Sequence, residues 1–279
     1  MKGMAALFEA GMKQMSKNRL ITVPVGLALL YPLLVTLLLT GIRTTDPGEA
    51  ASPDTAFGVI FMTVPMAATL ATGFIMILGS SLLPEEISAG RAGYWIAQPV
   101  SRNSYFSGMT AASFAVCCVV TSILFYGTSA SILAFLPYRP AAIVWAFACP
   151  LFWTAANLAL VTLVSLLIPR IASVIVCLGV AGVSNFLGSV SQVADAVPQG
   201  AFSETVRVVS TAGFFIFPAD PMLRLAMAGL RPADSSIQDM ITSMGFATTP
   251  PAWQIAYAVV WSAAVFWLAA ARFRRIDLA

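Results

Sequence analysis

Charged residues are scarce in this chain. They make up 10% of the sequence, while hydrophobic residues make up 59%; a soluble globular domain carries about 25% charged residues. This balance predicts a membrane protein before any motif is considered. The net charge of +3 is small, so the composition gives no reason to expect a nucleic-acid partner.

Histidine is absent, and lysine occurs only at Lys2, Lys13 and Lys17. The absence of histidine excludes haem ligation by histidine, zinc sites built on histidine and histidine general bases. A P-loop needs a lysine followed by serine or threonine after a glycine-rich turn, because backbone amides and the lysine together hold the phosphates. No lysine here has that context. We therefore expect no catalytic, metal or cofactor-binding residues and no enzyme activity in this chain.

Cysteine is also sparse. Cys117, Cys118, Cys149 and Cys177 all lie inside apolar runs, and no pair has the Cys-x-x-Cys spacing. This placement favours small packing residues over redox or metal-binding residues.

Apolar runs long enough to cross a bilayer are the main positive feature. A helix rises about 1.5 Å per residue, so crossing a hydrocarbon core of about 30 Å takes about 20 apolar residues. The sequence therefore predicts an all-α integral membrane protein with six transmembrane helices, forming a single domain over residues 1–279. The predicted spans are residues 20–42, 57–83, 108–136, 141–168, 171–193 and 252–271.

Lysine and arginine are unevenly distributed between the two sides of these spans. Cytoplasmic flanks carry an excess of these residues, and one side has only Arg43 and Arg139 in its short connections. Both termini are therefore predicted to face the cytoplasm, and the connection 194–251 is predicted to be external. The cytoplasmic side is marked by Lys13, Lys17, Arg19, Arg91, Arg102, Arg170, Arg272, Arg274 and Arg275.

Two segments outside the spans also show helical periodicity. Apolar residues recur at helical spacing in residues 3–18, which predicts an amphipathic helix at the membrane interface; the alternative is a frayed tail. The connection 194–251 is too interrupted by proline to form another span. We expect it to hold external helices that lie on or dip into the outer leaflet, including one from Met222 to Leu230, followed by a loop over 232–250.

Prolines, small residues and two amides interrupt the apolar spans. Pro24, Pro32, Pro65 and Pro150 are predicted to kink or locally open their helices. Small residues of the fifth span are predicted to let a neighbouring helix approach closely; they are Gly179, Ala181, Gly182, Ser184 and Gly188. Asn157 and Asn185 are expected to form hydrogen bonds to another helix, and the alternative is that they line a substrate path.

The connection 84–107 carries an unusual group of polar and aromatic residues. Glu85 and Glu86 follow the second span, and Gly90 and Gly93 should interrupt any helix. An apolar cluster follows in a segment that should face water, and Ser101 or Asn103 can cap the third span. Two interpretations of the cluster stand side by side, a protein interface or aromatic residues resting at the lipid headgroups. The cluster is Tyr94, Trp95 and Ile96.

This connection resembles the loop between the second and third spans of ABC transporter permeases of the type-two exporter family. The resemblance rests on Glu86, on Gly90, and on an apolar stretch that ends in Pro99-Val100-Ser101-Arg102. Residues 3–18 resemble that family's elbow helix, and the basic ending 272–277 resembles its tail. Residues 217–224 resemble an Asn-Pro-x-Asp-x-x-Arg stretch of some members, including the permease of nitrous oxide reductase maturation, with Phe217 in place of the Asn.

The resemblance implies a permease subunit in the bacterial inner membrane, paired with a second copy of itself or a similar permease. Two separate ATPase subunits would hold the ATP and magnesium, and an external partner protein is a further expectation. The connection would be a coupling helix seated in a groove of the ATPase. The implied contact residues are Glu85, Glu86, Gly90, Arg91, Tyr94, Trp95, Ile96, Pro99, Ser101 and Arg102.

Other functions are weighed against this exporter. A secondary transporter commonly places ionisable residues near the membrane midplane, and the first five predicted spans have none in their middle. A mechanical relay would use the same ATPase contact to act on an external partner through residues 194–251. An intramembrane enzyme fits least, because the chain lacks histidine and a Gly-x-Ser-x-Gly motif.

Overall fold

A computed structural model describes residues 2–17, 19–45, 48, 52–90, 101–136, 138–196, 201–232 and 249–276. These residues are helical apart from turns, short links and one isolated bridge between Pro140 and Pro232. The helices are α1 (Lys2–Lys17), α2 (Arg19–Thr45), α4 (Pro53–Gly79), α5 (Leu82–Ser88), α7 (Arg102–Phe135), α8 (Ile143–Ser165), α9 (Arg170–Ala196), α10 (Ala201–Ile216), α11 (Asp220–Leu230) and α13 (Ala252–Arg274).

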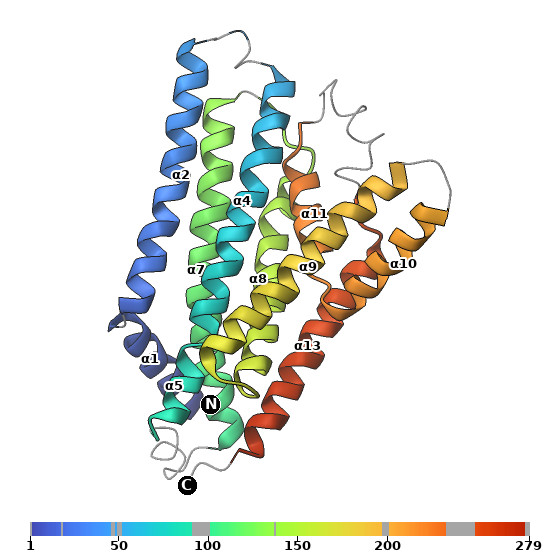
Figure 1. Ribbon diagram of the computed structural model, residues 1–279. Helices are drawn as coiled ribbons and strands as arrows, with labels where there is room; N and C mark the ends of the chain where they lie inside the picture. The colour runs from blue at the N-terminus through green and yellow to red at the C-terminus, as the bar shows by residue number, and fades with distance from the viewer. Residues whose placement is uncertain are drawn as a thin grey trace.

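Within the described residues, six helices are long and apolar enough to cross a membrane, which confirms the predicted helical fold class and is compatible with a multi-pass membrane protein. They are α2, α4, α7, α8, α9 and α13, and each contains most of one predicted span (Figure 1). Both bounds of the second span differ from the predicted ones by four residues. Its helix begins at Pro53, because the Ser52 side chain accepts a hydrogen bond from the Asp54 N–H and caps the helix.

A turn at Ser80 and Ser81, directly after Gly79, interrupts the helix of the predicted second span. A Cβ on Gly79 would lie 2.5 Å from Val161 Cγ1 and 2.7 Å from Leu158 Cδ1, so only glycine lets α4 approach α8 this closely. The hydroxyls of Ser80 and Ser81 then donate to the carbonyls of Ile77 and Leu78. This turn ends α4 and starts the short helix α5.

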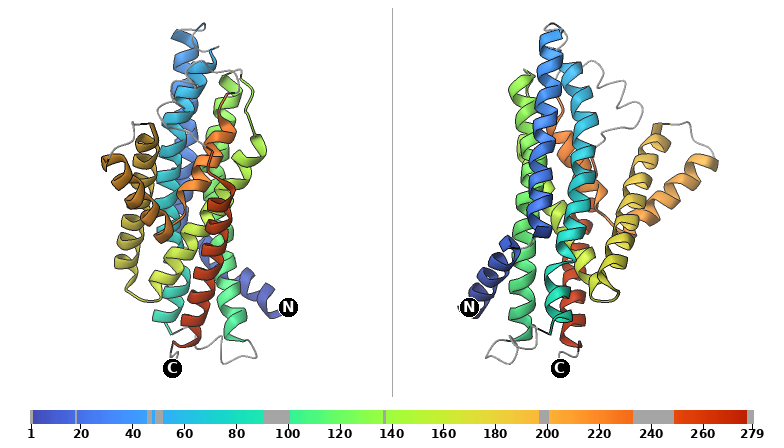
Figure 2. Two further views of the ribbon diagram at one scale, coloured as in Figure 1. Left: turned by 90° about the vertical axis from the view of Figure 1, so that its right-hand side faces the viewer. Right: turned by 60° about the vertical axis from the view of Figure 1, so that its left-hand side comes forward.

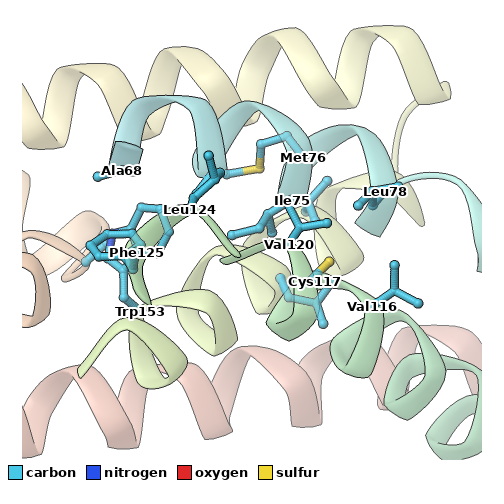
Figure 3. Close-up of a cluster of buried hydrophobic side chains, with 14 of the residues drawn as sticks. Ala68, Ile75, Met76, Leu78, Val116, Cys117, Val120, Leu124, Phe125 and Trp153 are labelled. Atoms are coloured by element: carbon cyan, nitrogen blue, oxygen red, sulfur yellow. The ribbon is translucent and has the colours of Figure 1, made fainter. Parts of the chain in front are cut away.

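The core lies between α4, α7 and α8. About half of the residues in their most apolar windows are buried, at 50%, 56% and 56%. Figure 3 shows Ile75 and Met76 of α4 among Val120 and Leu124 of α7. The Trp153 ring of α8 meets Phe125 edge to face, with ring centroids 5.8 Å apart.

The remaining spans lie at the periphery of this core. Only 17% of the apolar window is buried in α2, 22% in α9 and 17% in α13. Figures 1 and 2 show α9 and α10 leaning away from α2, α4 and α7. The outward sides of these helices are apolar, and they are available to lipid or to another protein chain.

Helices α2, α4 and α8 continue through their prolines, and one proline in each helix shares a local hydrogen-bonding pattern. A proline lacks the N–H of a normal helical residue. In each helix a threonine four residues after a proline donates its hydroxyl to that proline's carbonyl, as Thr36 does to Pro32 at 2.8 Å. The other pairs are Thr69 with Pro65 and Thr154 with Pro150.

The segment between the fifth and sixth spans forms a sharply bent helix pair. The chain bends by 101° between Glu204–Ile216 and Asp220–Leu230, which is the geometry of a broken span or a re-entrant loop. The end of α11 packs on the start of α8, where Ala142 N donates to Gly229 O at 3.0 Å. A Cβ on Gly229 would lie 2.6 Å from Ala142 O, so this approach requires glycine. The predicted helix from Met222 to Leu230 lies within α11, and 233–248 fall outside the described residues.

Candidate functional site at the loop end of the bundle

We call one end of the bundle the loop end. It carries α1, α5, the first residues of α7, the turn between α8 and α9, and the last turn of α13 (Figures 1 and 2). Residues 101 and 102 return the chain to this end after α5, so the predicted coupling loop begins and ends here. The polar interactions at this end join helices that are far apart in the sequence.

Helix α5 is short but anchored. Leu82 and Leu83 are buried against the bundle, and they hold the first turn of the helix. The helix stops at Ser88, and Gly90 follows with φ of 69°, a conformation that favours glycine. The prediction that Gly90 interrupts the helix is therefore confirmed. Ser88, Ala89 and Gly90 are exposed, so the chain leaves α5 into solvent.

Glu85 joins α5 to α9. Its Oε1 accepts from the Arg170 guanidinium in an ion pair, with the two side chains 30% and 29% exposed. Arg170 is the first residue of α9, so the pair links the end of the second span to the start of the fifth. A half-exposed pair of this kind adds about 0.2–1 kcal/mol to stability, so its main effect is to fix the relative position of two helices.

Glu86 joins α5 to α1. Its side chain is buried, with 1% exposure, and its Oε1 accepts a hydrogen bond from Gln14 Nε2 at 2.7 Å. Hydrogen bonds to a charged group contribute about 1.5–3 kcal/mol. Leu7 and Met15 of α1 are buried on the same side, whereas Glu9 and Lys13 are exposed and pair with each other. The Lys13 ammonium lowers the pKa of the Glu9 carboxyl.

Ser101 and Arg102 join the start of α7 to the end of α13. Ser101 caps α7, because its Oγ accepts from the Ser104 N–H at 3.1 Å. Arg102 donates from one guanidinium nitrogen to the Arg274 carbonyl at 2.8 Å and to the Ile276 carbonyl at 3.1 Å. A cation is favourable at a helix C-terminus, where carbonyl groups lack helical partners. Arg102 therefore holds the last turn of α13 against α7.

A cleft of ≈ 510 Å³ opens between α5, the α8–α9 turn and the end of α13. Glu85 and Arg170 lie on its wall beside the exposed Ser88 and Arg272. Apolar atoms line much of the rest, from Pro84, Ile87, Leu166, Ile168, Pro169 and Ile276. An apolar floor with charged groups at its edge can accept a protein side chain.

Half of the predicted contact residues fall in the described part of the chain. Glu85, Glu86, Gly90, Ser101 and Arg102 all lie at the loop end. The others lie in 91–100, outside the described residues; they are Arg91, Tyr94, Trp95, Ile96 and Pro99. Of the described set, Glu85 and Gly90 reach solvent, whereas the Glu86 carboxylate is buried within the chain and Arg102 is bound to α13.

Sequence reasoning did not identify Gln14 as part of this site. The signal was present, because Gln14 falls on the side of α1 that also carries the buried residues Leu7 and Met15. A polar residue on the apolar side of an amphipathic helix usually has a specific partner. The partners of Glu85 and Arg102 were not predictable in this way, because they come from α9 and α13.

Asn157 and Asn185, for which a substrate path was the alternative prediction, are not among the residues that form the loop end. Asn157 is fully buried in α8, and its Nδ2 donates to the Trp153 carbonyl of the same helix at 2.9 Å. The expectation that this amide group donates to another helix is therefore wrong, because the i−4 carbonyl lies within its reach. Asn185 is half-buried on α9. In the part of the chain that the structure describes, no group of acidic residues and cysteines has the arrangement of a metal site.

No model of a known protein family matches this sequence, and no curated protein matches it.

Proposed function

We propose that this chain is the membrane subunit of an exporter that is driven by a separate ATPase, and that the ATPase binds at the loop end. The observation that carries this proposal is the set of interhelical links at that end. Glu85 links α5 to α9, Glu86 links α5 to α1, and Arg102 links α7 to α13. A displacement of the loop between α5 and α7 is therefore transmitted to three other helices, α1, α9 and α13.

The composition of the chain supports the proposal that a separate subunit hydrolyses ATP. The sequence has no P-loop lysine, so the energy source must lie on another polypeptide. The sequence of the loop contains the aromatic cluster of Tyr94, Trp95 and Ile96, and Glu85 and Arg170 line a cleft at the loop end. Aromatic side chains flanked by charge are typical of the energetically dominant part of protein interfaces.

The mechanism follows from these links. ATP binding changes the shape of the ATPase and moves the loop, α5 carries the movement to α1 and α9, and the spans tilt to open a path to the outside. This is a two-state element that a ligand bound elsewhere biases. Driving such an element from one state nearly fully to the other takes about 5.5 kcal/mol of differential binding. Firm links between helices let this energy reach the spans.

In this proposal α1 is the elbow helix, residues 84–107 form the coupling loop, and both termini face the cytoplasm of a bacterium. The bend between α10 and α11 is then a re-entrant element that opens to the outside. A second copy of the chain would cover the apolar outward sides of α2 and α9, which have few buried residues. Gly179 and Gly182 of α9 have open space around them, which leaves room for another helix to approach.

The test is copurification of the ATPase with the tagged full-length chain from its own membranes. We expect an ATPase with P-loop motifs to copurify with the wild-type chain. Replacing Tyr94 and Trp95 together by alanine should remove most of that ATPase, because the substitution takes away the aromatic contacts.

The matched control replaces Trp145 by alanine. Trp145 is half exposed near the start of α8, at the opposite end of the bundle from α5. It should leave the amount of ATPase unchanged. Absence of any P-loop ATPase from the wild-type preparation, or equal recovery with all three chains, would contradict the proposal.

A further inference from the structure

A polar cavity of ≈ 270 Å³ lies within the bend between α10 and α11. Residues from α9, α10, α11 and α13 line it, and it is separate from the loop end. Figure 1 shows the last turns of α10 beside α13, with α11 turning away from them. Polar side chains between apolar helices need a specific reason, since burying an unpaired polar group is unfavourable.

One charge of this cavity is balanced. Arg224 Nε lies 2.8 Å from Asp220 Oδ2, and the two side chains are 15% and 13% exposed. Arg224 also donates to Gln254 Oε1 of α13 at 3.2 Å. Gly188 of α9 makes room for this pair, because a Cβ there would overlap the Asp220 carboxylate. The ion pair thus forms a fixed wall of the cavity.

A second charge of the cavity is not balanced. Arg207 of α10 lines the cavity, and among the described residues no carboxylate forms an ion pair with it. Glu204, one turn earlier, lies with Arg207 in an adjoining cleft, again without an ion pair in the described part of the chain. With Arg207, Arg224 and Asp220 on its walls, the cavity carries one excess positive charge.

A buried hydroxyl next to Arg207 also lacks a partner. Ser210 is 7% exposed and lines the cavity, and its Oγ forms no hydrogen bond with any described residue. It lies three positions after Arg207, so both side chains are on the same side of α10. Buried hydroxyls are nearly always hydrogen-bonded in native proteins. A guanidinium and a spare hydroxyl facing one small space are suited to bind an oxyanion.

We propose that this cavity binds a phosphate group, with Arg207 as the charge partner and Ser210 as a hydrogen-bond donor. A singly charged phosphate would neutralise the excess charge. Phe214 and Trp253 form an aromatic wall, with ring centroids 5.6 Å apart and planes at 89°, which can cover the ester side of a phosphodiester. The phosphate can come from a phospholipid headgroup or from free phosphate. The site is independent of any ATPase contact.

Titration of the purified full-length chain in dodecyl maltoside tests the site. The probes are inorganic phosphate, dihexanoyl phosphatidylglycerol and the phosphate-free dihexanoylglycerol, with sodium chloride as the ionic-strength control. We expect saturable binding of at least one phosphate probe and none of dihexanoylglycerol. Arg207→Gln should weaken it about tenfold, because a charge-assisted hydrogen bond is lost, and Ser210→Ala about fivefold.

The matched control is Arg139→Gln, an exposed arginine on the α7–α8 connection. It should bind like the wild type. Binding of the lipid alone would identify a headgroup site, and binding of inorganic phosphate alone would identify a site for the free ion; both support the proposal. Lack of saturable phosphate binding, or equal binding by the Arg207→Gln, Ser210→Ala and Arg139→Gln chains, would overturn it. Arg207 is exposed, so its replacement leaves the fold intact.

Discussion

The loop end and the α10–α11 bend contain similar polar residues, but these residues have different structural effects at the two places. At the loop end, Glu85 and Arg170 are separated by 85 residues and Gln14 and Glu86 by 72, so each contact ties two distant helices together. At the bend, the ion pair between Asp220 and Arg224 lies within a single helix. The first arrangement resists separation of helices, whereas the second shapes the wall of a cavity.

This difference predicts which substitutions affect which property. Breaking a contact within the bend should reduce the local stability of the cavity wall and leave the loop end intact. Breaking a contact at the loop end should have a smaller effect on stability and a larger effect on the transmission of movement between helices.

Asp220→Asn should be the most destabilising. It removes the negative charge and leaves the Arg224 guanidinium without its ion-pair partner in a largely buried place. The expected loss is about 3 kcal/mol of the free energy of unfolding, measured by thermal unfolding in detergent. Glu9→Gln is the control, because that pair is exposed. Equal thermal midpoints for the two variants would contradict the claim that the ion pair between Asp220 and Arg224 stabilises the cavity wall.

Gly229→Ala should destabilise the packing of α11 on α8. The new Cβ would lie 2.6 Å from Ala142 O and 2.8 Å from Ala146 N, and backbone atoms cannot move aside as side chains do. Overpacking of this kind costs about 2 kcal/mol. Gly58→Ala, in open space on α4, should leave the thermal midpoint unchanged or raise it. A Gly229→Ala chain that unfolds at the wild-type temperature would show that α11 is free to shift.

Gln14→Leu should weaken the contact between α1 and α5. The substitution keeps the side chain large but removes the donor to the buried Glu86 carboxylate. We expect a loss of about 1.5–2 kcal/mol and faster proteolysis of α1. Lys13→Leu, at the exposed neighbouring position, provides the comparison. If both variants behave alike, the hydrogen bond does not hold α1.

Arg102→Gln should loosen only the end of α13. The variant loses the donors to the Arg274 and Ile276 carbonyls, and about 1 kcal/mol of local stability corresponds to about fivefold faster amide hydrogen exchange at residues 274–276. In Arg274→Gln the backbone carbonyl that Arg102 binds is retained, so exchange should stay at the wild-type rate. Unchanged hydrogen exchange in Arg102→Gln would contradict the claim that Arg102 holds the end of α13 against α7.

Much of this architecture could be predicted from hydrophobicity, and the contacts between helices could not. Each apolar run of about 20 residues must place its backbone hydrogen bonds inside a helix, so the six spans follow from the sequence alone. The amphipathic periodicity of residues 3–18 and of Met222–Leu230 likewise predicted helices from the local sequence alone, at α1 and α11. The close approach of α4 to α8 at Gly79 escaped prediction because it depends on Val161 and Leu158 of another helix.

The site shows the same division. The sequence predicted that Gly90 interrupts the helix and that Ser101 can cap α7, because both are local properties of the backbone. The sequence predicted that Glu86 contacts the ATPase, whereas in the structure its side chain is buried against Gln14 of the same chain. Burial of a single carboxylate is decided by the tertiary arrangement, and periodicity over a few residues does not contain that information.

Crosslinking from the exposed end of α5 tests the central claim most directly. A water-soluble maleimide–benzophenone reagent is attached to Ser88→Cys at the loop end or to Val208→Cys on α10. Both chains also carry Cys118→Ser, because Cys118 is only partly buried, whereas the native Cys117, Cys149 and Cys177 are buried. We predict that light crosslinks the copurified ATPase to the Ser88→Cys chain, with a yield that changes when ATP is added, and not to the Val208→Cys chain. A crosslink only from Val208→Cys, or from neither position, would contradict the account.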